Sequence, residues 1–146
     1  MNYVEKLRSM FEVCEQKIDA GYSIAFEELL IEIGVFYDEL GETQRKCVAN
    51  KIFSIMNLDL RFGCDYKISY AKRIMTSTAI EYENCIKLVS VFEELVLLRK
   101  FGICKTNIVD ELNCFYKSWG ERQTETTKNI INQLIKESNY LKNWEL

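Results

Sequence analysis

Apolar residues recur along this chain at spacings of three and four, which is the period of one face of an α-helix. The first segment shows the pattern clearly, with Val4, Leu7, Phe11, Cys14 and Ile18 on one stripe. Proline is absent and only six glycines interrupt the chain, so long helices are permitted almost everywhere. The pattern therefore predicts an all-α fold.

Capping residues and glycines divide this pattern into six to seven helices. The expected segments run from a cap at Asn2 to Gly21, from a cap at Ser23 to Leu40, from about 43 to 57, from a cap at Asp65 to about 75, from about 81 to 101, from a cap at Thr106 to Gly120, and from about 124 to 142. Gly41 is expected just beyond the second helix, and Thr76–Thr78 predicts a break or bend after the fourth.

The segment from about 81 to 101 is apolar around most of its circumference, which is typical of a helix surrounded by others. We expect it to be the central helix of a single globular bundle. A length of 146 residues fits one domain, 1–146, and is enough to bury a core without disulfides or a structural metal.

Six cysteines are spread along the chain without any CxxC pair, which excludes the common zinc and thioredoxin-like signatures. No apolar run approaches the ~20 residues that a bilayer span needs. The first residues also lack the apolar stretch of a signal peptide. We therefore expect a cytoplasmic protein with free thiols, of which Cys14, Cys47 and Cys85 are small buried hydrophobes on helical stripes.

Histidine is absent, which removes the usual general base and the commonest metal ligand. The glycines form neither GxGxxG nor GxxxxGK[ST], so no phosphate-binding loop is indicated. Carboxylates occur in pairs such as Glu27/Glu28 and Glu93/Glu94, which we interpret as solvated helix surface, although a cation site at Glu28 and Glu32 stays open. The sequence predicts a protein that is not an enzyme and has no catalytic residues, metal or cofactor.

The charges are segregated along the chain. Residues 1–44 carry three basic and ten acidic side chains, a net charge of −7, whereas residues 45–105 carry eleven basic and six acidic ones, a net charge of +5. Clustered charge of one sign steers encounters with an oppositely charged partner, so the pattern favours binding.

The basic segment, with Tyr66 and Tyr70 among its charges, has the composition of a nucleic-acid site. A pI of about 5.2 and the acidic segment nearby argue against nucleic acid as a partner, because both repel a phosphate backbone. We instead expect some of these basic side chains to pair with the acidic segment.

The predicted helix 23–40 is the best candidate for a binding surface. At about 100° per residue, its core stripe includes Leu29, Ile33 and Leu40. The opposite face then consists of Glu28, Glu32, Glu39, Ile24, Ile31 and Val35. Apolar anchors beside charges are typical of a protein-binding patch. The alternative is that another helix of the bundle covers this face.

A small, acidic, all-helical chain without catalytic residues resembles the immunity proteins that neutralise bacterial toxins, including those of contact-dependent inhibition systems. The resemblance lies in overall character. It implies a non-catalytic inhibitor that covers the basic active-site cleft of a cognate toxin, typically a nuclease, with an acidic surface. Glu28, Glu32 and Glu39 would suit that role, and the implied partner is a basic toxin domain.

A second resemblance is local. Ser118-Trp119-Gly120-Glu121-Arg122 is similar to the Asn-Trp-Gly-Arg motif of Bcl-2-like proteins, with Ser118 in place of the Asn and Arg122 one position late. It implies the alternative of a viral helical adaptor that binds an amphipathic partner helix in a groove. The plainer interpretation is a core aromatic, Trp119, followed by a helix stop at Gly120. Partner identity and oligomeric state stay open.

Overall fold

The computed structural model describes residues 3–22, 24–77, 81–142 and 144. Across these residues the chain is all-helical, with seven α-helices, two short 3₁₀ turns and no strand, which confirms the predicted fold class. The elements are α1 (Tyr3–Asp19), α2 (Ala25–Phe36), η1 (Tyr37–Glu39), α3 (Glu42–Met56), η2 (Leu60–Phe62), α4 (Cys64–Thr76), α5 (Tyr82–Lys100), α6 (Thr106–Glu121) and α7 (Glu125–Glu137).

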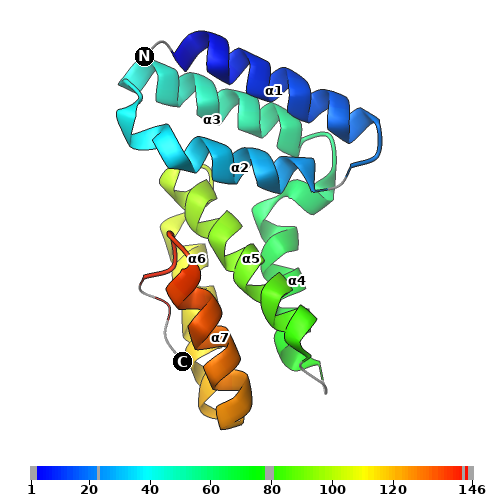
Figure 1. Cartoon of the computed structure of the whole chain (residues 1–146), viewed down its shortest axis with the longest axis vertical. Helices are drawn as coiled ribbons and strands as arrows, with labels where there is room; N and C mark the ends of the chain where they lie inside the picture. The colour runs from blue at the N-terminus through cyan, green and yellow to red at the C-terminus, as the bar shows by residue number, and fades with distance from the viewer. Residues whose placement is uncertain (1–2, 23, 78–80, 143, 145–146) are drawn as a thin grey trace.

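The helices form two sets that meet at a steep angle. α1, α2 and α3 lie side by side at one end, and α4 to α7 extend away from them (Figure 1). α5 packs against α2, α4, α6 and α7, so it joins the two sets. The prediction of a central apolar helix is therefore confirmed.

An aromatic cluster on α5 closes the core of the second set. The Phe92 ring stacks on Trp144 at a centroid distance of 4.2 Å and meets the edge of Tyr116 at 5.0 Å. All three side chains are buried. Aromatic pairs in these geometries add to the free energy gained by burial. The cluster therefore attaches the end of the chain to α5 and α6.

Glycine marks two helix ends, and the first of them, at Gly21, is predicted by the sequence. Gly21 follows α1 with a φ of 92°, and Gly102 follows α5 with a φ of 81°. Both values lie in the left-handed region, which glycine adopts without steric cost. Asn2 and Ser23, the expected caps of the first two helices, lie outside the described residues, as does part of the Thr76–Thr78 cluster.

The second predicted helix is too long. α2 ends at Phe36, and the chain continues through η1 instead of remaining α-helical to Leu40. Tyr37 packs on the Phe101 ring at 4.6 Å and Leu40 is buried, so tertiary packing determines the path. Gly41 has a φ of −74° and is the N-cap of α3, not a helix C-terminal residue.

The seventh predicted helix is also too long. α7 ends at Glu137, and Ser138 is extended, with a ψ of 137°. This exit brings Leu141 and Trp144 back to the core, where both are buried. Burial of these two side chains therefore outweighs the continued helical pattern on which the sequence prediction depended.

Three capping predictions are wrong by one or two residues. Gly63 is the N-cap of α4, whose first residue precedes Asp65, and Lys105 is the N-cap of α6, so Thr106 is already helical. Gly120 does not stop α6, because the helix continues through Glu121 and buries this glycine. Small shifts of this kind are common where no side-chain cap fixes the boundary.

No helix in the described ranges is both long enough and apolar enough to cross a membrane.

Candidate functional site

The outer face of α2 consists of Ile24, Glu28, Ile31, Glu32 and Val35, and all five side chains are exposed. Exposure reaches 63% at Ile24, 40% at Ile31 and 78% at Val35. The described helices therefore do not cover this face, so the alternative of a covered face is wrong. Four of its six expected residues lie on α2, and Ile24 is the N-cap residue of this helix.

The opposite side of α2 explains why this face points outward. Phe26, Leu29, Leu30 and Ile33 are almost fully buried against the rest of the protein. Their positions follow the helical period, so residues between them in the sequence are turned away from the core. A helix anchored so firmly on one side presents the other side as a rigid surface.

Glu39 does not belong to the outer face. It lies in η1, after the end of α2, so the helical angle assumed for it does not apply. Its carboxylate accepts a 2.7 Å hydrogen bond from the Tyr3 hydroxyl on α1. This bond raises the pKa of Tyr3. The prediction that Glu39 shares a face with Glu28 and Glu32 is therefore wrong.

The two carboxylates of the outer face differ in their surroundings. Glu28 lies 3.8 Å from the Lys17 ammonium on α1, with both side chains half exposed. Among the described residues Glu32 forms no ion pair. A shallow groove of about 150 Å³, lined in part by Val13 of α1, runs beside them. Exposed pairs of this kind are weak, so both carboxylates are available to a partner.

A cavity of about 400 Å³ adjoins the outer face at the start of α2. Its walls come from α2, η2, α4 and α5, and Ile24 belongs both to the cavity and to the outer face. Tyr66 and Tyr70 stack at 6.4 Å on one wall, and the Arg73 guanidinium lies over both rings. The shape of this cavity cannot be predicted from the pattern of any one helix, because four separate elements build it.

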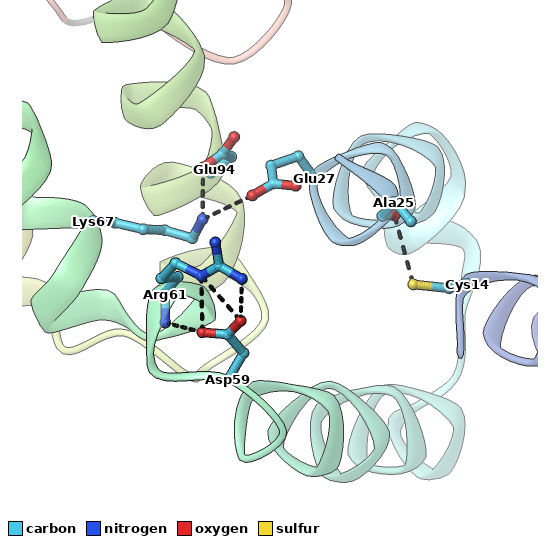
Figure 2. Close-up of polar contacts among 7 residues, drawn as sticks. All are labelled: Cys14, Ala25, Glu27, Asp59, Arg61, Lys67 and Glu94. Carbon is cyan, nitrogen blue, oxygen red and sulfur yellow. Dashed lines mark hydrogen bonds and ion pairs between the residues drawn. The ribbon is translucent and has the colours of Figure 1, made fainter. Parts of the chain in front are cut away.

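Lys67 of α4 lines this cavity. Its ammonium contacts two carboxylates (Figure 2). Its Nζ lies 2.8 Å from Glu94 Oε2 on α5 and 3.3 Å from Glu27 Oε1 on α2. The side chains are 5% exposed at Lys67, 8% at Glu94 and 26% at Glu27. One buried ion cluster therefore joins the two sets of helices at the place where they meet.

Burial raises the pKa of Glu94 to about 7, although the Lys67 ammonium acts in the opposite direction. Burial alone would lower the pKa of Lys67, but the carboxylates of Glu94 and Glu27 outweigh it and raise that pKa. The lysine is therefore an ammonium and not a nucleophilic amine. Glu27 Oε2 is buried without a hydrogen-bond partner among the described residues.

The positions of Glu27 and Glu94 correct two expectations about exposed carboxylate pairs. The pairs Glu27/Glu28 and Glu93/Glu94 were assigned to solvated surface, yet Glu94 is buried and Glu27 is half-buried. A signal for the cluster does exist in the sequence, because Lys67 lies on the same helical stripe as Ala71 and Ile74. A lysine on a core stripe needs a buried carboxylate, and the apolar central helix contains one.

Other basic side chains also pair within the chain, as expected. The Lys100 ammonium lies 3.1 Å from the Asp38 carboxylate of the acidic segment. Arg61 forms hydrogen bonds with the Asp59 carboxylate, the shortest of them 2.6 Å (Figure 2). These pairs reduce the positive charge that the basic segment offers to a phosphate backbone.

Within the described ranges, no group of three or more histidine, cysteine, aspartate or glutamate side chains is arranged to hold a metal ion. Cys14 and Cys85 are buried as expected, but Cys47 is exposed on α3. Trp119 is a buried core residue near the end of α6, and none of the residues 118–122 lines the cavity beside α2.

Compared with known proteins, the chain matches no protein-family model, no curated protein and no solved structure.

Proposed function

We propose that this chain is a non-catalytic inhibitor that binds a basic protein through the outer face of α2, in the manner of the immunity proteins it resembles. The observation that carries the proposal is the composition of that face. Ile24, Ile31 and Val35 are exposed side by side with Glu28 and Glu32 on a helix whose other side is buried. Apolar anchors with charges beside them are typical of protein interfaces.

The apolar anchors supply binding free energy. Each exposed aliphatic side chain gains about 25 cal/mol for every Å² of apolar surface that a partner covers. Because α2 is already ordered by its buried side, little conformational entropy is lost on binding. Ile24, Ile31 and Val35 are therefore suited to fill a hollow on a partner.

The acidic side chains supply steering and specificity. α1 and α2 both belong to the segment of net charge −7, and Glu12, Glu15 and Asp19 are exposed on α1. A surface with this charge attracts a basic cleft such as the substrate site of a nuclease. The toxin would be blocked because its cleft is occupied, and this chain would need no catalytic group.

The proposal is tested by charge reversal on the outer face. The wild-type chain and the Glu28→Lys/Glu32→Lys variant are used to capture partners from the source organism. The expected partner is a basic polypeptide that stops growth when it is expressed alone. Co-expression of the wild-type chain should restore growth, and the variant should bind at least tenfold more weakly and fail to restore it.

A matched control carries the same charge change elsewhere. Glu111→Lys/Glu121→Lys alters two exposed glutamates of α6, away from α2. This control should capture the partner and protect as well as the wild type. Equal capture by all three proteins would remove α2 from the interface, and a captured partner without toxicity would overturn the inhibitor function.

A further inference from the structure

The cavity beside α2 is not explained by the proposed inhibitor function, which uses only Ile24 of its walls. Its volume of about 400 Å³ lies within the range of roughly 300–1,000 Å³ that is typical of pockets for small ligands. It also lies where the two sets of helices meet, with walls from α2, η2, α4 and α5. Pockets for small molecules are frequent at such junctions, so the cavity is a candidate ligand site.

The walls of the cavity are largely apolar, and part of this apolar surface faces solvent. The exposed fraction is 63% at Ile24, 40% at Ile86 and 38% at Tyr66. A ligand that covers such surface removes it from water, which favours binding. The ligand therefore needs an apolar body. The apolar side chains that line the cavity are Ile24, Phe62, Tyr66, Tyr70, Ile86 and Val91.

The two tyrosines favour a flat aromatic body and disfavour a positive charge. The Tyr66 and Tyr70 rings are nearly parallel, with an angle of 10° between their planes. The Arg73 guanidinium lies over both rings, 5.6 Å from the first centroid and 5.7 Å from the second. A cationic ligand at these rings would be repelled by Arg73, whereas an aromatic ring can pack against them.

The charged groups of the cavity that are free to meet a ligand are cations. Glu27 and Glu94 both contact the Lys67 ammonium, so the charges of these three side chains offset one another. Lys87 also lines the cavity, but it is exposed and forms no ion pair with any described residue. An ammonium has only donors, so its natural partner is an anionic acceptor.

Arg61 offers a second donor on the exposed side of the cavity. Its Nε and Nη2 atoms donate to the Asp59 carboxylate at 3.0 and 2.6 Å, which fixes the guanidinium in place. The Nη1 atom points away from Asp59 and forms no hydrogen bond with any described residue (Figure 2). A guanidinium held in this way presents a pre-oriented donor to a carboxylate.

We propose that this cavity binds a small aromatic carboxylate. The aromatic body lies against Tyr66, Tyr70 and the other apolar walls, and the carboxylate accepts hydrogen bonds from Lys87 and from Arg61 Nη1. Because the Lys67 cluster already joins α2, α4 and α5, little ordering of the protein is needed on binding. The inference does not rest on the proposed inhibitor function, since its test uses the chain alone and needs no protein partner.

The test measures the binding of four small probes to the wild-type chain by titration calorimetry. Benzoate and naphthoate are aromatic carboxylates, naphthamide is the neutral analogue of naphthoate, and naphthylmethylammonium is a cationic one. Naphthoate should bind about tenfold more tightly than naphthamide, and the cation should bind most weakly. In NMR spectra of the labelled protein, naphthoate should shift the amide signals of Tyr66, Tyr70 and Ser90.

Variants locate the carboxylate and the aromatic body separately. Lys87→Met and Arg61→Met should each weaken naphthoate binding by about fivefold. Lys117→Met removes an exposed lysine of α6 that does not line the cavity, and it should leave the affinity unchanged. Ser90→Trp places a ring inside the cavity and should abolish binding. Ser69→Trp adds the same ring at an exposed position of α4 outside the cavity, and it should bind naphthoate normally.

Four results would each overturn the proposal. They are no binding of either benzoate or naphthoate, equal affinity for naphthoate and naphthamide, shifted amides away from the cavity, and wild-type affinity in both Lys87→Met and Arg61→Met. These two charge variants alter exposed side chains, so they keep the proposal testable even if Ser90→Trp does not fold.

Discussion

Lys67 and Glu94 form a 2.8 Å ion pair in which both side chains are buried, and Glu27 joins it from α2. The three residues come from α4, α5 and α2, so the pair lies where the two sets of helices meet (Figure 2). A buried pair is not in itself strongly stabilising, because removing two charges from water is costly. The pair also links α2 to α4 and α5, because Glu27 Oε1 lies 3.3 Å from the same ammonium.

Removing the lysine should destabilise the protein strongly. Lys67→Met keeps most of the side-chain volume but leaves Glu94 buried without a cation. We expect the free energy of unfolding to fall by about 3–5 kcal/mol near pH 8, as measured by urea denaturation. Lys46→Met is the control, because the Lys46–Glu42 pair is fully exposed to solvent and should change stability very little. A loss below about 1 kcal/mol for Lys67→Met would contradict the structure.

Stability should depend on pH through Glu94. Its pKa is about 7 in the folded protein, above its ordinary value of 4.5, so the folded state holds a proton that the unfolded chain has released. The contribution of Glu94 is therefore full at or below pH 4.5 and is lost as pH rises through 7. Glu94→Gln removes this titration. The stability difference, wild type minus variant, should fall by about 2–3 kcal/mol between about pH 5 and pH 8.

The measurement is urea unfolding of both proteins across that pH range. Taking the difference between the two unfolding free energies cancels the pH-dependent contributions of the carboxylates that both proteins contain. A difference that stays constant would show that the pKa of Glu94 is not raised in the folded protein. A difference that rises with pH would show that this pKa is lowered, which is the result expected if the Lys67 ammonium outweighs burial. Either result would contradict a raised pKa for Glu94.

Much of the fold could be predicted from periodicity, because the spacing of apolar residues along a single helix shows which of its sides is buried. The apolar circumference of the 81–101 segment identified α5, and the alternation around residues 24–35 identified the exposed face of α2. These features depend on one helix at a time. Helix ends were less predictable, since Leu40 and Trp144 follow tertiary packing and not the helical period.

The cavity could not be predicted because it depends on contacts between elements. Glu94 and Lys67 are recognisable as a pair only when α4 and α5 are placed side by side. One local signal was present, since Lys67 occupies a core position of its helix.

Gly34 has a role that its helix propensity does not reveal. A Cβ at this position would lie 2.7 Å from Leu97 Cδ2 on α5 and 3.0 Å from the Tyr140 hydroxyl. That hydroxyl donates to the Ile31 carbonyl at 3.3 Å. The glycine therefore allows α2, α5 and the segment after α7 to pack closely, and it is not simply a weak point in α2.

Gly34→Ala tests this close approach because two effects oppose each other. Alanine favours the helix by about 1 kcal/mol, whereas overpacking a buried contact costs about 1–3 kcal/mol. Leu97 is fully buried and has little room to move, so we expect a net loss of about 1–2 kcal/mol in urea unfolding. In a Leu97→Val background the clashing Cδ2 atom is gone, and the same substitution should become neutral or stabilising. An equal loss in both backgrounds would show that Leu97 is not what excludes a side chain at position 34.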